Sequence, residues 1–506
     1  MQQAKHFPSI WVTAFTLLAI VLHLYAATSL SYHRDELLYF ALGYHPDWGY
    51  PSVPPVIGWL AGLVRITLGT SVFAVKFLPA VLSGVFVWLI AAIVKEMRGG
   101  TFATVLACAT AVFMPVSLRT FHLFQPVHLD LIWWTVLTLL LLRYLNTARS
   151  RYLLYLGVVV GVALLTKYLV LLWVGGLLLG LLIFRPTIFR ERHLYYGAGI
   201  ALLIWVPNLL WQVTHDWAAV GHLQALSRQQ LVNVNRMNIL TDQLTMAFAG
   251  SLLLVPGLFQ LLRRYRVLAT AVCFTFAVLL LLRGKSYYAM GTFPALITAG
   301  AVLWEKWLGP TGWRYVLPVA MVVLTVPILP LGLPVIGEAA LVTYFQDLER
   351  DYGIVPGRRW EDGKIHPLPQ DYADQLGWTE LQQALVAAYA QEPSPETTAL
   401  YCENYGQAGA ALMVKGHQGV PEPISFSDAF NYWVPDSLSE PFTAFYYIND
   451  EPASDLDDWF GQVEVVGAID KPEAREYGTR IYRYSEPLRP FQEFWTARLA
   501  DDPSPY

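Results

Sequence analysis

Charged side chains are scarce in this chain. They make up 14% of its 506 residues, whereas about 25% is usual in soluble domains. Hydrophobic residues make up 55% of the chain, and the mean hydropathy is +0.42. Several apolar runs exceed the ~18 residues that are typical of a membrane-spanning helix. A chain that is soluble throughout is therefore excluded, and we expect a multi-pass membrane protein.

Cysteine is also rare, and nucleotide-binding motifs are missing. The three cysteines, Cys108, Cys273 and Cys402, lie far apart, which excludes a disulfide framework and a zinc-ligand spacing. Neither G-x-G-x-x-G nor a P-loop occurs, so nothing indicates a bound nucleotide. We expect no cofactor, no metal site and no nucleic-acid partner. The first apolar run, 11–30, is too long for the apolar part of a signal peptide, so we interpret it as the first span.

Acidic residues are distributed unevenly along the chain. Residues 338–506 contain 29 of the 38 acids but only 11 of the 34 lysines and arginines. We therefore predict two domains, a transmembrane domain at 1–337 and a soluble extracytoplasmic domain at 338–506.

The apolar runs predict about eleven spans. They lie near 10–30, 72–94, 101–118, 129–145, 152–166, 168–184, 194–212, 239–262, 267–283, 288–304 and 314–334. Alternate loops are short and basic, for example KEMRGG (95–100), RPTIFRERH (185–193) and RRYR (263–266). Because basic loops stay in the cytoplasm, the segment RDELLYF (34–40) and the acidic tail are predicted on the outer face.

The tail and the first outer loop carry their own structural signals. Helical periodicity occurs at 374–391, and β-rich composition occurs at 398–405, 442–449, 462–468 and 479–487. This mixture predicts a small α/β or α+β domain. The apolar stretch 54–68 is short for a span and contains Arg65, so together with 35–45 it is predicted to be helical and to lie in the outer membrane interface.

Charged residues at membrane depth are costly, so each is a candidate for function. The candidates, all on the predicted outer face, are Arg34, Asp35, Glu36, Asp130, Lys167, Arg283, Lys285, Tyr287 and Tyr288. Carboxylates can take a proton from a hydroxyl group. Cations can hold a departing lipid-linked phosphate and stabilise its charge.

Structural interpretations of the same residues stay open. Asp35 and Glu36 suit the first turn of a helix, where acids are favourable, and Asp130 suits the start of the fourth span. Lys167 can extend to lipid headgroups. Arg283, Lys285 and the two tyrosines suit an interfacial belt.

The sequence resembles the bacterial members of glycosyltransferase family 39, which use polyprenyl-phosphate sugars and have the GT-C fold. It is similar, more distantly, to lipid A aminoarabinose transferases and protein O-mannosyltransferases. The family's Asp-Glu pair is matched by Asp35 and Glu36. Other matching segments are WGYPSVPPVIGWLA (48–61), FQPVHLD (124–130), LTKY (165–168), PNLLWQVTHDW (207–217), GKSYYAMGTFPAL (284–296), DQLGWTEL (374–381), ENYGQAGA (403–410) and NYW (431–433). The basic residue or histidine that many relatives carry just before the Pro-Pro is absent, because Val53 stands there, after Ser52.

The resemblance implies a GT-C membrane glycosyltransferase in the bacterial inner membrane, with its soluble domain outside. The donor would be a polyprenyl-phosphate-linked sugar, and the acceptor would be a hydroxyl group on a lipid, a glycan or a protein. Asp35 would be the general base of a single inverting displacement, and Glu36 and Asp130 would orient groups or tune Asp35. The phosphate would be held by Arg283 and Lys285 with Tyr287 or Tyr288, with Arg34 and Lys167 as further candidates.

Two other functions fit parts of the pattern. A transporter or flippase for a lipid-linked sugar would use the same cations and would not need Asp35 as a base. No internal repeat and no charges at the bilayer midplane are visible, however, and transporters often have both. A membrane-anchored binding module would use only the acidic tail.

Overall fold

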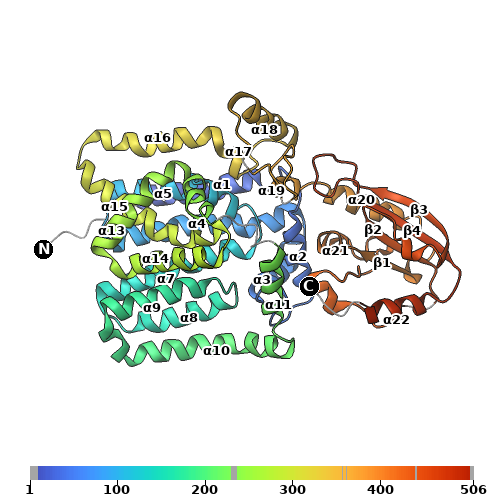
Figure 1. The fold of residues 1–506 in the computed structure, drawn as a ribbon. Coiled ribbons are helices and arrows are strands. Elements are labelled where there is room, and N and C mark those ends of the chain that lie inside the picture. The colour runs from blue at the N-terminus through green and yellow to red at the C-terminus, as the bar shows by residue number, and fades with distance from the viewer. Residues whose placement is uncertain (1–8, 230–235, 356, 361, 439–440, 502–506) are drawn as a thin grey trace. The chain divides into compact units, whose positions relative to one another are not determined.

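The computed structural model describes residues 9–229, 236–355, 357–360, 362–438 and 441–501 (Figure 1). The chain forms two compact units. The helical unit consists of Met1–Ala27, Val53–Val56 and Lys76–Val335. The mixed unit consists of Thr28–Ser52, Ile57–Val75 and Ile336–Tyr506. The domain boundary at residue 338 stays a prediction, and the unit that contains the C-terminal sheet also takes in two segments from the start of the chain.

Long apolar helices build the helical unit, because a helix satisfies its own backbone hydrogen bonds where water is absent. Its helices are α1 (Ser9–Ala26), most of α4 (Val72–Glu96), α5 (Thr101–Phe113), α6 (Pro115–Thr120), α7 (Pro126–Thr147), α8 (Arg151–Leu164), α9 (Val170–Phe184), α10 (Arg192–Thr214), α11 (Ala218–Gln229), α12 (Asn238–Ala247), α13 (Ser251–Arg264), α14 (Arg266–Leu282), α15 (Phe293–Leu308), α16 (Val316–Thr325) and α17 (Leu329–Gly332). Short 3-10 turns connect several of them, including η4 (Ser286–Thr292) between α14 and α15.

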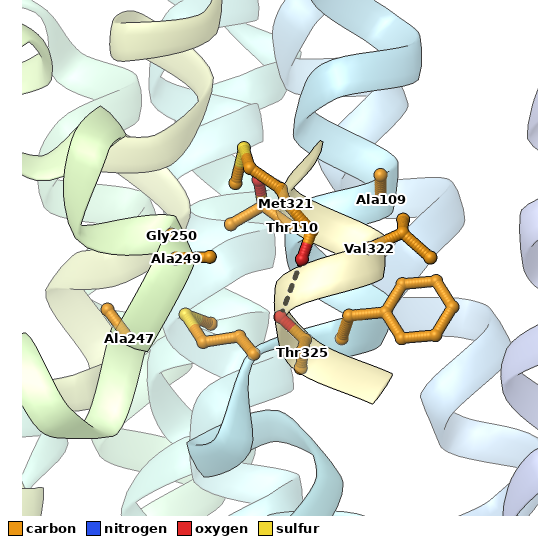
Figure 2. Close-up of a pocket in the computed structure, with 10 residues that line it drawn as sticks. Ala109, Thr110, Ala247, Ala249, Gly250, Met321, Val322 and Thr325 are labelled. Carbon is orange, nitrogen blue, oxygen red and sulfur yellow. Dashed lines mark hydrogen bonds between the residues drawn. The ribbon is translucent and has the colours of Figure 1, made fainter. Parts of the chain in front are cut away.

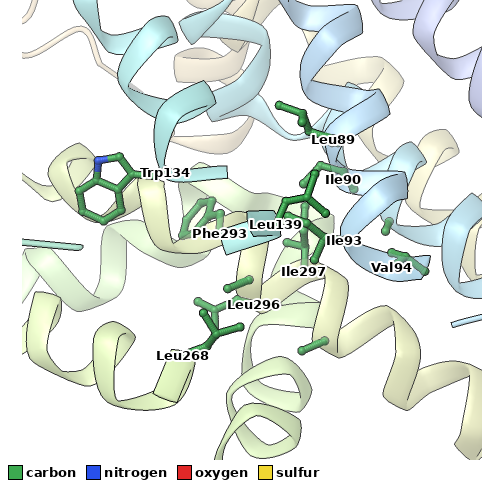
Figure 3. Packing of buried hydrophobic residues seen from close by; sticks show 14 of the residues in the cluster. Leu89, Ile90, Ile93, Val94, Trp134, Leu139, Leu268, Phe293, Leu296 and Ile297 are labelled. Atoms are coloured by element: carbon green, nitrogen blue, oxygen red, sulfur yellow. The ribbon is translucent and has the colours of Figure 1, made fainter. Parts of the chain in front are cut away.

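The helical unit is packed by aliphatic side chains and small residues. Figure 3 shows Ile90 and Ile93 of α4 beside Leu139 of α7 and Ile297 of α15, with all four side chains buried. The backbone of α10 lies against Gly157 of α8 so closely that a Cβ there would clash. Such close contacts between small residues hold apolar helices together in lipid, where the hydrophobic effect does not drive helices to associate.

A small cavity lies between α5, η3 (Phe248–Gly250) and α16 (Figure 2). Its volume is about 10 Å³, which is room for about one water molecule. In its lining, the Thr325 hydroxyl already donates to the Met321 carbonyl at 2.8 Å. We interpret this cavity as a packing gap and not as a ligand site.

Each of the eleven predicted apolar segments overlaps at least one helix. Among the described residues, six helical stretches are both long and apolar enough to cross a membrane: Ser9–Ala26, Val72–Glu96, Pro126–Thr147, Arg192–Thr214, Asn238–Arg264 and Gly312–Gly332. Other apolar helices, such as α5, α8, α9 and α14, are shorter. The multi-pass helical architecture is therefore confirmed, whereas the number of eleven spans is not.

The mixed unit contains a four-stranded sheet in the order β1-β2-β4-β3. Its strands are β1 (Thr398–Cys402), β2 (Ala444–Asn449), β3 (Phe460–Ala468) and β4 (Arg480–Pro487), each within or next to a predicted strand. β1 and β2 are parallel, and α21 (Tyr405–Met413) lies in the connection between them. The β2–β4 and β3–β4 pairs are antiparallel. The predicted C-terminal sheet is therefore present.

Helices cover both faces of this sheet because successive side chains of a strand point in opposite directions. Tyr446 of β2 stacks on Tyr389 of α20 (Trp378–Tyr389) with ring centroids 4.4 Å apart. Its neighbour Phe445 packs on Phe491 of α22 (Phe491–Asp501) at 5.1 Å. The remaining helices of the unit are α2 (Arg34–Leu42), most of α3 (Val56–Leu68), α18 (Glu338–Tyr352) and α19 (Gln370–Ala373). The helices predicted at 35–45 and 54–68 are thus present as α2 and α3, and their position in the membrane interface stays a prediction.

Candidate active site

The two acids at the start of α2 have different surroundings. His33 is the N-cap residue of α2, and its Nδ1 accepts a hydrogen bond from the Asp35 backbone at 3.1 Å. The buried Glu36 closes a capping box, in which its Oε2 accepts the His33 backbone N–H at 2.8 Å. Such a box satisfies backbone donors that a helix start leaves free. The helix-cap interpretation therefore describes Glu36, whereas the Asp35 carboxylate takes no part in the box.

The Asp35 carboxylate instead lies beside a tyrosine and an arginine. The Tyr405 hydroxyl donates a hydrogen bond to Asp35 Oδ1 at 3.0 Å, although 370 positions separate the two residues. The guanidinium of Arg34 lies over the same tyrosine ring, 4.5 Å from its centroid. Burial raises the pKa of Tyr405 well above its usual value of 10, and the charge of Asp35 raises it further. Tyr405 therefore stays protonated and acts as a donor at neutral pH.

The segment ENYGQAGA (403–410) brings Tyr405 to this position. Asn404 caps α21, and its side chain accepts the backbone N–H groups of Gly406 and Gln407. Gly409 lets α21 lie directly on α2, because a Cβ at that position would approach the Leu37 backbone to 2.8 Å. The glycines and the cap of this motif thus place Tyr405 against the helix that carries Asp35.

Asp374, in the segment DQLGWTEL (374–381), supports the start of α2. Its carbonyl accepts the Arg34 backbone N–H at 3.0 Å and the Trp378 indole N–H at 2.8 Å. Burial raises the pKa of the Asp374 carboxyl, and the nearby His33 and Arg475 oppose that rise. Nη1 of Arg475 lies 3.3 Å from both carboxyl oxygens of Asp374.

Asp130 belongs to a second cluster of candidates, which lies in the helical unit. Its buried carboxylate is on the first turns of α7, and Oδ1 accepts the indole N–H of Trp134 at 3.0 Å. Trp134 stacks on Trp173 of α9 with centroids 5.3 Å apart, and Gly291 packs directly against its ring. Two tryptophans and a close backbone contact therefore hold this acid in place.

Lys167 lies between α8 and α9 and faces the aromatic pair of the segment GKSYY. Its ammonium is 5.5 Å from the ring centroid of Tyr287 and 5.4 Å from that of Tyr288. The Lys167 ammonium interacts electrostatically with the charged groups of Asp130 and Lys285. Lys285 caps η4 and is half-buried, whereas Arg283 ends α14 in a left-handed conformation (φ 54°) and is exposed. The structure therefore brings Asp130, Lys167, Lys285 and the two tyrosines together, and it leaves Arg283 at the surface.

Two residues of these clusters were not among the sequence candidates. Tyr405 lies in a quoted motif, but its type and position gave no sign of a partner 370 positions away. Trp134 lies four residues after Asp130, which is one helical turn. That spacing could have predicted that Trp134 contacts Asp130 on the same face of the helix. In the part of the chain that the structure describes, no three His, Cys, Asp or Glu side chains form a group suited to a metal ion.

Comparisons with known proteins agree on one type of enzyme. A family model described as dolichyl-phosphate-mannose-protein mannosyltransferase matches residues 52–211. Lipid A galacturonosyltransferase RgtD of Rhizobium johnstonii is 26% identical over 238 residues. This match covers 44% of the present chain and 47% of RgtD, so the chain aligns with about half the length of this relative.

Two crystal structures of ArnT from Cupriavidus metallidurans have a similar fold over nearly the whole chain. One is the apo state, with a TM-score of 0.63, and the other is bound to undecaprenyl phosphate, with a TM-score of 0.61. Each is 14% identical and covers 94% of this chain and 98% of its own. The resemblance to GT-C glycosyltransferases of the family 39 type, predicted from the motifs, is therefore confirmed.

Proposed function

We propose that this protein is a membrane glycosyltransferase that moves a sugar from a polyprenyl-phosphate donor to a hydroxyl acceptor. The observation that supports it most is the arrangement around Asp35, whose carboxylate lies beside Arg34 and accepts the Tyr405 hydroxyl at 3.0 Å. The relatives named above are glycosyltransferases, and ArnT was crystallised with undecaprenyl phosphate. A transporter or flippase is not favoured, because the relatives are glycosyltransferases and transport would not need Asp35 as a base.

Asp35 is the general base in this proposal. The acceptor oxygen forms a bond to the anomeric carbon, the bond from that carbon to the phosphate oxygen breaks, and the hydroxyl proton passes to Asp35. The configuration is inverted because one displacement occurs. A base must be charged before it accepts a proton, and the hydrogen bond from Tyr405 fixes the position of the Asp35 carboxylate. Glu36 is a positioning residue, because its contact with the His33 backbone fixes the start of α2.

The donor phosphate is assigned to the second cluster. Lys167, Lys285, Tyr287 and Tyr288 supply two ammonium groups and two hydroxyl groups, which suit a phosphate that leaves as an anion. Asp130, fixed by Trp134, orients Lys167 through its charge. The exposed Arg283 is a secondary candidate for this phosphate. A phosphate leaves as a stable anion, so no catalytic acid and no metal ion are required.

The localisation follows from the same proposal. Polyprenyl-phosphate sugars are membrane lipids, so the chain would lie in the bacterial inner membrane with the mixed unit on the periplasmic side. RgtD is named for lipid A, a glycolipid. A glycolipid hydroxyl group is therefore the first acceptor to test, before a protein or another glycan.

The substitution Asp35→Asn tests the base. Purified wild-type and variant proteins are compared with a radiolabelled polyprenyl-phosphate sugar and extracted glycolipids. Removal of a general base typically costs about 10²–10⁴-fold in rate, so we expect transfer to be almost lost while donor binding is retained. The matched control is Asp47→Asn, which removes the charge of a carboxylate that lies after the end of α2 and accepts the Trp48 backbone N–H. Equal turnover by wild type and Asp35→Asn would reject the assignment of the base.

A further inference from the structure

A second cavity lies in the mixed unit, at the carboxyl ends of the parallel strands β1 and β2. Its volume is about 280 Å³, close to the ~300 Å³ at which small-molecule sites begin. Residues from both strands, from the segment Pro452–Leu456 and from α22 line it. Ligands of sheets with parallel strands usually bind at these carboxyl ends, so the position favours a binding site.

The lining combines flat aromatic rings with hydrogen-bonding groups. Tyr401 and Tyr447 are neighbours on adjacent strands, with ring centroids 5.9 Å apart and nearly parallel planes. The Tyr447 hydroxyl donates to Glu403 Oε2 at 3.0 Å and accepts from the Asn449 amide at 2.9 Å. This network fixes the Glu403 carboxylate at the cavity while leaving the residue exposed. Arg498 of α22, which packs over the Phe426 ring at 5.4 Å, adds a cation.

The charges of the lining restrict the chemistry of a ligand. Glu403 and Asp455 are carboxylates, and Arg498 is the cation of the lining, so the charged side chains sum to a net negative charge. An acyl chain would offer no hydrogen bonds to these charged groups while excluding water from them, which is costly. A phosphate or a uronic acid would meet two carboxylates at close range. A ring with apolar C–H faces and several hydroxyl groups satisfies the aromatic rings, the carboxylates and the guanidinium together.

We infer that this cavity binds one or two neutral or amino-sugar rings of a glycan. The Tyr401 and Tyr447 side chains contact the apolar face of a ring, Glu403 and Asp455 accept hydroxyl or ammonium hydrogens, and Arg498 donates to ring oxygens. Glu403 lies two residues before Tyr405, the donor to Asp35. The bound glycan is therefore assigned to the acceptor, and this assignment rests on the proposed function.

Binding is tested on the full-length protein in a sugar-free detergent, because glycoside detergents would compete. Saturation-transfer NMR with titration compares glucosamine, lactose, galacturonic acid and the open-chain polyol sorbitol. We expect saturable binding of glucosamine or lactose, at least fivefold weaker binding of galacturonic acid, and none of sorbitol. Tighter binding of galacturonic acid, or no saturable binding of any sugar, would overturn the inference.

Three variants test whether the sugar binding measured by NMR occurs in this cavity. Ser454→Phe places a ring at the cavity from an exposed position, so we expect sugar binding to be lost without an effect on folding. Glu403→Gln keeps an acceptor for Tyr447 but removes the charge, and we expect at least fivefold weaker glucosamine binding. The control Glu464→Gln changes a carboxylate of β3 that pairs with Arg483 outside the cavity, and it should bind as wild type does. Unchanged affinity in Ser454→Phe would place the sugar elsewhere.

The acceptor role has its own measurement. In the transfer assay, Ser454→Phe should raise the KM for a glycolipid acceptor at least fivefold and leave the KM for the donor unchanged. If wild type binds sugars but transfers none, the proposed function fails and the binding site stands. If transfer occurs and Ser454→Phe leaves the acceptor KM unchanged, the cavity is not the acceptor site.

Discussion

The two clusters of candidate residues are built in different ways. Around Asp35, hydrogen bonds dominate, because a capping box, a tyrosine hydroxyl and a backbone carbonyl fix the first turn of α2. Around Lys167, aromatic rings dominate, because two tyrosines face the ammonium and two stacked tryptophans hold its partner acid. The contrast matches the proposed chemistry. A base needs directed donors that fix one carboxylate, whereas a phosphate site needs positive charge.

Lys167→Met gives the strongest test of the phosphate cluster. The substitution removes the electrostatic interaction of Lys167 with Asp130. It also removes one positive charge from the proposed phosphate site. Truncation of one partner of a buried charge pair typically costs about 2–5 kcal/mol, so we expect donor affinity to fall roughly 100-fold. A lipid-phosphate binding assay measures it. Lys306→Met, which removes an exposed lysine from α15 of the same unit, should bind the donor as wild type does. Unchanged donor affinity in Lys167→Met would remove this lysine from the phosphate site.

Tyr405→Phe tests the base cluster, with an effect of intermediate size. It removes the hydroxyl that donates to Asp35, and a hydrogen bond to a charged group contributes about 1.5–3 kcal/mol. We expect kcat to fall roughly tenfold or more, with the donor KM unchanged, in steady-state transfer assays. Tyr477→Phe, at an exposed position of the mixed unit, is the matched control. A change confined to the donor KM would contradict the assignment of the base and the donor phosphate to different clusters.

Gly409→Ala tests whether the contact between α2 and α21 holds the base in place. A Cβ would lie 2.8 Å from the Leu37 backbone, and overpacking of this kind costs about 1–3 kcal/mol. We expect a lower Tm and reduced transfer together, since the strain falls on the helix that carries Asp35. Gly337→Ala, where a Cβ meets nothing within 4 Å, should leave both unchanged. Full activity and stability in Gly409→Ala would show that α2 and α21 can move apart to accommodate the Cβ and that their close contact does not hold the base in place.

The smallest expected effect concerns pH. His45 Nε2 lies 2.7 Å from Glu422 Oε1, and this contact, with Lys415, lowers the pKa of Glu422 from 4.5 to about 2. An acid whose pKa is lower in the folded protein stabilises the fold at pH values above its unfolded pKa. That contribution is lost as pH falls from about 4.5 toward 2. Because the side chain is 40% exposed, solvent screening limits the contribution to less than about 1 kcal/mol. Thermal unfolding across this pH range should show less pH dependence in Glu422→Gln than in wild type. Identical pH profiles would show that the ion pair does not stabilise the protein.

Much of the fold could be predicted because hydropathy is a local property. The apolar segments coincide with helices, and the β-rich segments at 398–405 and 442–449 contain β1 and β2. The pairing of Lys167 with Tyr287 and Tyr288 could not be predicted in the same way, since 120 positions separate them and nothing in either segment specifies the other. The number of spans stays a prediction for a related reason. Hydropathy identifies an apolar helix, but length decides which helices can cross a bilayer alone.

The sequence by itself determined a multi-pass helical protein with a small C-terminal sheet, and it selected the acids and cations worth testing. Only the tertiary structure decided their surroundings. Glu36 closes a helix cap, Asp35 accepts a hydrogen bond from a tyrosine 370 positions away, and Arg283 is exposed. The physical reason is that helix formation and burial in lipid depend on local composition, whereas a hydrogen bond depends on two distant segments meeting within about 3 Å.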